Sequence, residues 1–185
     1  MGERVEFAGV SGSLATGEGA GLGVLVLLPP GADVTDAFAA EGFTALAPDL
    51  PADDVPGAAR ALTGAVDYLV EHPAVRGHGI AVVGYGVGGG LALWLASLRP
   101  DQVRAVVPFH GVMPAEEAQP AWDKVLAPVE GHFAAAAEDG WAHKIEEELQ
   151  ARGREVRMFV YPEVDEDAER QAWVRTLEFL RAKLG

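Results

Sequence analysis

The chain has no cysteine among its 185 residues and few basic side chains. The absence of cysteine excludes disulfides and thiolate metal sites. Lysine and arginine together number 14 against 28 acidic residues, for a net charge of -14. Such a charge repels phosphate, so we expect neither nucleic acid nor an anionic membrane as a partner.

Long apolar runs are also missing. The apolar segments have the length of strands, far below the ~20 residues that cross a bilayer. The N-terminus, Met1-Gly2-Glu3-Arg4-Val5, has no basic region followed by an apolar core, so we predict no signal peptide. These absences favour a cytoplasmic protein.

Several short apolar runs alternate along the chain with segments of helical periodicity. Unbroken runs are typical of strands buried on both faces of a parallel sheet, and the alternation indicates helices packed on both sides. We predict a single α/β domain over residues 1–185, with a mainly parallel, doubly wound sheet. The predicted strands are 24–28, 43–47, 79–83, 103–109, 128–133 and 156–161, and the predicted helices are 58–71, 88–98, 141–151 and 168–184.

The start of the chain gives weaker signals. Edge strands are predicted over 5–7 and 14–16, around a turn at 11–13. Asp33 is predicted to cap a short helix that ends near Ala40, with Gly42 just beyond it. The segment 114–124 reads as a loop.

The segment Gly84-Tyr85-Gly86-Val87-Gly88 lies between a predicted strand and a predicted helix. This is the context of the G-x-nucleophile-x-G elbow, whose middle residue presents a reactive side chain above the sheet. Here the middle residue is Gly86, which has no side chain. The motif therefore predicts the backbone of a nucleophile site without its nucleophile.

With this motif and several sequence segments elsewhere, the chain resembles the dienelactone hydrolases, a branch of the α/β-hydrolase fold. The matching phrases occur in family order over nearly the whole chain: AEGFTALAPDL (40–50), VGYGVGGG (83–90), FHGV (109–112), APVEGHF (127–133), VYP (160–162) and WVRTLEFL (173–180). The resemblance implies an α/β-hydrolase-like fold.

The family acts through a Cys or Ser, an Asp and a His. The resemblance places these three residues at positions where this chain has other residue types. The nucleophile falls on Gly86, the acid on Ala137, and the base near Glu166, within 163–166. No histidine follows His143. The resemblance thus implies a degenerate member that binds a small carbonyl or carboxylate ligand, or a protein partner, without catalysis and without a cofactor.

The predicted ligand pocket lies at the carboxyl ends of the strands, where ligands bind in such folds. Its expected lining is Gly31, Tyr85, Gly86, Val87, His110, His132 and Trp141. A competing hypothesis is a rebuilt, non-covalent ester or lactone hydrolase or isomerase. In that case His110 or His132 activates a water and Asp139 or Asp49 orients it. Otherwise the two imidazoles are wall or core residues with satisfied polar atoms.

Three further alternatives follow from single features. Gly84-x-Gly86-x-x-Gly89 fits a dinucleotide fingerprint, although the next strand ends at Phe109-His110 rather than at an acid. The acidic segment 163–169 suits a hard cation but has no EF-hand spacing, and acids are also expected in the first turn of a helix. A purely structural or assembly role would show as a filled pocket at the elbow.

Overall fold

A computed structural model describes residues 2–29, 34–51, 54–111, 116–137 and 140–185. Eight strands form one sheet in the order β1-β2-β4-β3-β5-β6-β7-β8. Strand β2 runs antiparallel to both of its neighbours, and the remaining pairs are parallel. The strands are β1 (Glu3–Phe7), β2 (Val10–Thr16), β3 (Gly21–Leu27), β4 (Phe43–Pro48), β5 (Val75–Tyr85), β6 (Val103–Phe109), β7 (Val129–Ala134) and β8 (Val156–Tyr161).

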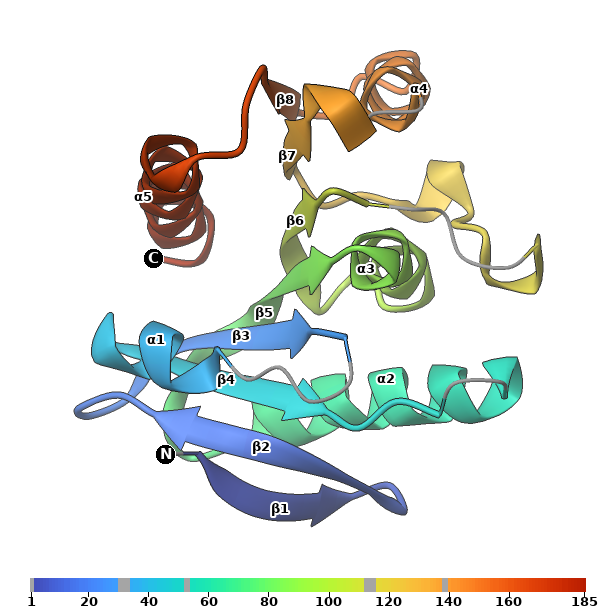
Figure 1. The fold of residues 1–185 in the computed structure, drawn as a ribbon. Helices are drawn as coiled ribbons and strands as arrows, with labels where there is room; N and C mark the ends of the chain where they lie inside the picture. Colours follow the sequence, from blue (N-terminus) through green and yellow to red (C-terminus); the bar gives the residue numbers. More distant parts are fainter. Residues whose placement is uncertain (1, 30–33, 52–53, 112–115, 138–139) are drawn as a thin grey trace.

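Helices cover both faces of this sheet (Figure 1). On one face lie α1 (Thr35–Ala40) and α5 (Glu166–Leu184). On the other lie α2 (Val55–Glu71), α3 (Val87–Leu98) and α4 (Trp141–Gln150). Three short 3₁₀ turns complete the described chain: η1 (Glu116–Ala118), η2 (Trp122–Lys124) and η3 (Ala135–Ala137). The predicted α/β fold with helices on both faces is confirmed.

The core is divided by the sheet into two clusters. Leu25, Leu62 and Leu93 belong to the cluster under α2, α3 and α4. Val83 and Leu180 belong to the cluster under α1 and α5. Alternate residues of the central strands feed opposite clusters, which is why these strands read as unbroken apolar runs.

The turn predicted at residues 11–13 is wrong, because those residues lie inside β2. The strand pair is instead closed by Ala8-Gly9, and Phe7 is paired with Val10. Both turn residues have positive φ, 49° and 77°, as the two-residue hairpin turns that match strand twist require. Alanine is unusual in that conformation, so the local sequence carried little signal.

Two helices begin earlier than predicted. Helix α2 starts at Val55, because the Asp54 carboxylate accepts a hydrogen bond from the Gly57 N–H at 2.9 Å. Helix α5 starts at Glu166 and is capped in the same way by Asp165, which accepts from the Ala168 N–H at 2.8 Å. Helix α1 ends before Gly42 (φ 86°), as expected, whereas Asp33 lies outside the described residues.

None of the described helices is both long enough and apolar enough to cross a membrane.

Candidate functional site

The elbow backbone is formed at Gly86, between the end of β5 and the start of α3. Gly86 has φ 58° and ψ -122°, a conformation that residues with side chains rarely adopt. Its N–H donates to the Phe109 carbonyl oxygen at 2.9 Å, and its own carbonyl accepts from the Gly89 N–H at 2.9 Å. The turn is thus held on both sides by backbone hydrogen bonds.

Neighbouring glycines allow this turn to pack tightly. A β-carbon at Gly84 would collide with the Gly88 carbonyl, and one at Gly88 would collide with the carbonyl oxygen of Leu27 on β3. At Gly86, in contrast, an added β-carbon would meet no atom within 4 Å. A side chain at this position would project into open space, as it does at a nucleophile elbow.

A cavity of about 310 Å³ lies beside the elbow, between the carboxyl ends of β5 to β8 and the first half of α5. This is the edge of a parallel sheet where ligands bind. The lining residues are Tyr85, Phe109, His110, His132, Tyr161, Val164, Ala168, Glu169, Ala172 and Trp173.

Aromatic rings from four adjacent strands stack beneath this cavity. Tyr85, Phe109, His132 and Phe159 are paired in register from β5 to β8. Their ring centroids are 4.7, 4.8 and 5.4 Å apart in that order, close to the spacing of strands. The Arg175 guanidinium lies over the outer ring, 4.2 Å from the Phe159 centroid. Burial raises the pKa of Tyr85, the first ring of this ladder, to about 12.

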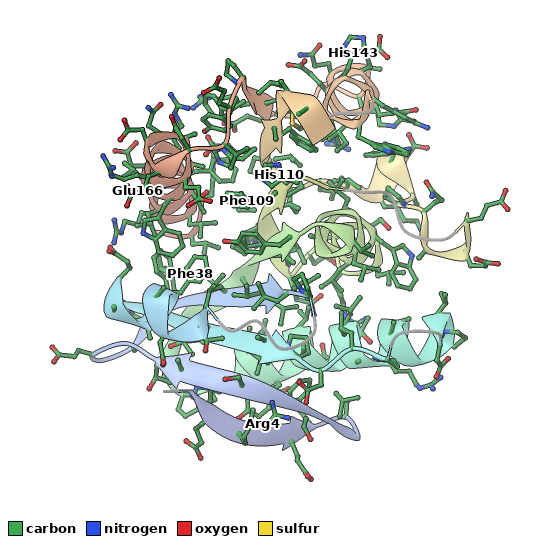
Figure 2. The ribbon with its side chains drawn as sticks, in the orientation of Figure 1. Arg4, Phe38, Phe109, His110, His143 and Glu166 are labelled. Atoms are coloured by element: carbon green, nitrogen blue, oxygen red, sulfur yellow. The ribbon has the colours of Figure 1, made fainter. Side chains whose placement is uncertain are left out.

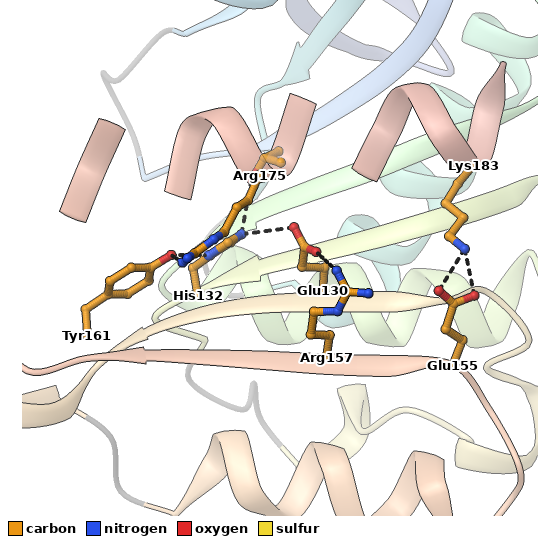
Figure 3. A network of polar contacts seen from close by, with 8 residues as sticks. Glu130, His132, Glu155, Arg157, Tyr161, Arg175 and Lys183 are labelled. Atoms are coloured by element: carbon orange, nitrogen blue, oxygen red, sulfur yellow. Dashed lines mark hydrogen bonds and ion pairs between the residues drawn. The ribbon is translucent and has the colours of Figure 1, made fainter. Parts of the chain in front are cut away.

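The His132 imidazole is enclosed in the ladder, with an exposed fraction of 1%, and both of its nitrogens have partners (Figure 3). Arg175 donates to the Tyr161 hydroxyl oxygen at 3.0 Å, and that hydroxyl lies 3.0 Å from His132 Nδ1. The Tyr161 hydroxyl thus links the Arg175 guanidinium to the His132 imidazole. The other ring nitrogen, Nε2, lies 3.3 Å from Thr176 Oγ1 and 3.5 Å from Glu130 Oε1.

Glu130 is a buried carboxylate, with an exposed fraction of 2%. Its Oε2 lies 3.6 Å from Arg157, which is largely exposed. Figure 3 shows this group on one face of β7 and β8, below α5. Both contacts have ion-pair distances, and among the described residues no hydrogen bond reaches the buried Glu130 Oε1.

His110 follows β6 and belongs to the cavity wall; Figure 2 labels it beside Phe109. Its φ is 48°, its N–H donates to the His132 carbonyl at 2.8 Å, and its Nδ1 accepts from the Ala134 N–H at 2.9 Å. In the neutral ring the proton must then be on Nε2, which makes that atom a donor. Burial and the neighbouring His132 lower the pKa of His110, and Glu169 opposes them.

The predicted pocket is corrected in part. Tyr85, His110 and His132 line the cavity, whereas Gly86 and Val87 adjoin it without being among its lining residues. Trp141 packs against the core cluster on the opposite face of the sheet, with Lys144 Nζ 5.0 Å from its ring centroid. Trp141 is far from the cavity because α4 packs on one face of the sheet, whereas the cavity lies on the face that α5 covers.

Other predicted site residues are placed elsewhere or are not described. Gly31 and Asp139 lie outside the described residues. Ala137 is in η3, directly after β7. Glu166 is the first residue of α5, and Asp49 forms an ion pair with Arg4 on β1.

The acidic segment 163–169 supplies the cap and the first turn of α5, as acids at a helix start are expected to do. Within the described residues, no group of three His, Asp or Glu side chains is arranged to hold a metal ion.

Sequence reasoning missed Phe159, Thr176 and Arg175. The first lies on the edge strand β8, and the others on α5, whose contacts depend on how that helix crosses the sheet. Strand register was the one available signal, since stacking across parallel strands requires aromatic residues at matching positions.

Known proteins share the sequence pattern and the fold of this chain. The model of the "Dienelactone hydrolase family" matches residues 53–184. "Protein usf" of Aquifex pyrophilus is 31% identical over an alignment of 144 positions, and the match covers 60% of this chain and 62% of that protein. The match thus spans less than two thirds of the curated relative.

Solved structures share the fold at lower identity. The structure titled "m3DLH" has a TM-score of 0.81 at 18% identity and covers 100% of this chain and 99% of its own. A dienelactone hydrolase from Anabaena variabilis has a TM-score of 0.76 at 24% identity and covers 100% and 98%. The family model covers well over half of the chain, and the chain therefore belongs to the dienelactone hydrolase family, with the α/β-hydrolase fold.

Proposed function

We propose that this chain is a non-catalytic member of its family that binds a small ligand through a carbonyl or carboxylate oxygen. The observation that carries the proposal is Gly86. The elbow turn keeps its backbone conformation and opens on free space, yet its central residue has no group that can attack a carbonyl. Covalent acyl transfer requires such a nucleophile beside a base and a group that orients the base.

The two nearby imidazoles support the same conclusion. His132 uses both ring nitrogens inside the ladder and is closed to solvent. His110 has Nδ1 bound to the Ala134 N–H, so its remaining nitrogen donates rather than accepts. A general base must accept a proton from the attacking group, and neither ring offers a lone pair to the cavity in this arrangement.

The cavity suits binding. Its volume of about 310 Å³ is at the lower end of small-molecule sites, roughly 300–1,000 Å³. The lining is mainly apolar, and the His110 Nε2–H is a hydrogen-bond donor for a ligand oxygen. An open cavity at this edge supports ligand binding over a purely structural role.

The second candidate function is a non-covalent hydrolase or isomerase, favoured by the place of His110 in the cavity wall. It requires His110 to release the Ala134 N–H and turn a free nitrogen toward a water. Dinucleotide binding has less support, because β6 ends at Phe109 without an acid for the ribose.

Hydrolysis assays with p-nitrophenyl acetate and simple lactones separate these functions. We expect wild-type turnover at the rate of buffer, and no gain in the Gly86→Cys variant, since no base is within reach. The matched variant is Gly86→Ala, which changes the backbone in the same way without a thiol. Wild-type turnover that disappears in His110→Asn would establish the enzymatic alternative.

Binding is tested with neohexyl acetate, an uncharged ester, by saturation-transfer NMR and by titration of the amide spectrum. We expect shifts at Tyr85, His110 and Trp173. Nitrogen NMR of the histidines should show the His110 proton on Nε2. Absence of binding, or a His110 ring protonated on Nδ1, would refute the proposal.

A further inference from the structure

We infer that the ligand of this cavity is a small organic cation that also has a carbonyl group, such as an ammonium ester or amide, with its positive charge against Glu169. This inference rests on the proposed function and adds the charge of the ligand. It departs from the carboxylate ligand that the sequence also allowed.

The first argument is the charge of the cavity wall. Besides Glu169, the polar lining residues are two tyrosines and two histidines, and the His110 ring is neutral because its Nδ1 accepts from the Ala134 N–H. The pKa of Tyr85 is raised to about 12 by burial, so its phenol is protonated at neutral pH. Neither lysine nor arginine is among the residues that line the cavity. Among the described lining residues, Glu169 is thus the single Asp, Glu, Lys or Arg side chain.

The second argument is that Glu169 has no cation of its own. In the part of the chain that the structure describes, no ion pair or side-chain hydrogen bond engages its carboxylate. Its neighbour Arg170 pairs with Asp167 at 2.9 Å, and Arg175 is held by Tyr161 and Phe159. A cationic ligand would supply the missing partner.

The third argument is geometric. His110 and Glu169 both line this cavity, and the Glu169 charge raises the pKa of His110, although burial and His132 together lower it by more. The donor is on the sheet side of the cavity and the carboxylate is on α5. A ligand that bridges them needs an oxygen at one end and a positive charge at the other.

The rest of the wall favours an organic cation over a metal ion. Val164, Ala168, Ala172 and Trp173 present apolar surface next to Glu169, where methyl or methylene groups on nitrogen lose their contact with water. Hard cations need several oxygen ligands, and no group of three acidic or histidine side chains is arranged for this within the described residues. The net charge of -14 attracts cations to the molecule.

The test compares acetylcholine with neohexyl acetate, which replaces the ammonium nitrogen by carbon and keeps the ester. We expect acetylcholine to bind about fivefold more tightly at low salt, the size of a partly exposed ion pair, and to lose most of that preference at high salt. The Glu169→Gln variant should bind both esters equally. Glu178→Gln removes one charge from an exposed position on the same helix and should keep the preference; circular dichroism checks that both variants fold.

The outcomes separate this inference from the proposed function. Equal affinity of both esters for the wild type, or a preference that survives Glu169→Gln, overturns the inference and leaves the proposed function standing. A loss of preference in Glu178→Gln as large as in Glu169→Gln assigns the effect to overall charge and also overturns the inference. If neither ester binds the wild-type protein, the proposed function fails with it.

Discussion

Alanine substitution at Gly86 and Gly88 tests whether the elbow is built as described. At Gly86 the cost is conformational, because φ is 58° and a β-carbon meets no atom within 4 Å. Such a residue costs about 1–3 kcal/mol, from which the reduced entropy of the unfolded chain returns roughly 0.4–1 kcal/mol. We therefore expect Gly86→Ala to lower the free energy of unfolding by ~1–2 kcal/mol.

At Gly88 the cost is steric. The residue is helical, so alanine gains about 1 kcal/mol of helix propensity. Its β-carbon, however, would overlap the Leu27 carbonyl oxygen, and the atom that must move belongs to the backbone of a central strand. Overpacking a rigid core costs roughly 1–3 kcal/mol or more, and a displaced backbone places this site at or beyond the upper end. After the gain in helix propensity, we expect Gly88→Ala to lower the free energy of unfolding by ~2 kcal/mol or more, which makes it the less stable of the two variants.

Urea denaturation followed by tryptophan fluorescence measures both variants. Gly153→Ala is the control for backbone strain, since Gly153 has φ 65° and a β-carbon there also meets nothing within 4 Å. Its loss of stability should be similar to that of Gly86→Ala. If Gly88→Ala is as stable as Gly86→Ala, the close approach of α3 to β3 is wrong, and with it the elbow geometry.

Three further predictions concern the polar groups around the cavity. Tyr161→Phe leaves the buried His132 Nδ1 without its hydrogen-bond partner and should cost about 1–3 kcal/mol in the same denaturation assay. The Tyr68 hydroxyl makes no hydrogen bond within the described residues, so Tyr68→Phe should change stability by less than ~0.5 kcal/mol. The pKa of His110 is lowered in the folded protein. Below the ordinary histidine value of about 6.5, position 110 therefore binds more protons in the unfolded chain than in the folded protein. The stability of wild type relative to His110→Asn should therefore decrease below that pH and stay constant above it; a difference that increases on acidification would contradict the description of this site. Asp165→Ala removes the cap of α5 and should cost ~1 kcal/mol, measured by thermal unfolding, and a neutral result would show that the cap contributes nothing.

The fold was predictable because its signals are local and repeated. Short apolar runs such as 24–28 and 103–109 have the length and the β-branched composition of buried strands, and the helical stretches between them favour a parallel sheet. Errors arose where a local signal was weak or was decided by distant residues. Ala8 occupies a turn that its residue type does not indicate, and Trp141 was placed in the pocket although α4 packs on the opposite face.

The candidate site was predictable only in outline. The rule that ligands bind at the carboxyl ends of strands selected Tyr85, His110 and His132, which the structure brings to one cavity. It gave no information on the protonation of the two imidazoles. That depends on the Ala134 N–H for His110 and on the Tyr161 hydroxyl for His132, which are contacts between strands.

The sequence alone determined the family pattern, the strong negative charge and the absence of a side chain at Gly86, because each of these is a property of residue identity and order. The tertiary structure decided which groups share a space. Register stacks the four rings of the ladder, and the packing of α5 across the sheet brings Glu169 to the cavity that contains His110. Charge, hydrogen bonding and burial act through distance, and distances between residues far apart in the chain exist only once the sheet and its helices have assembled.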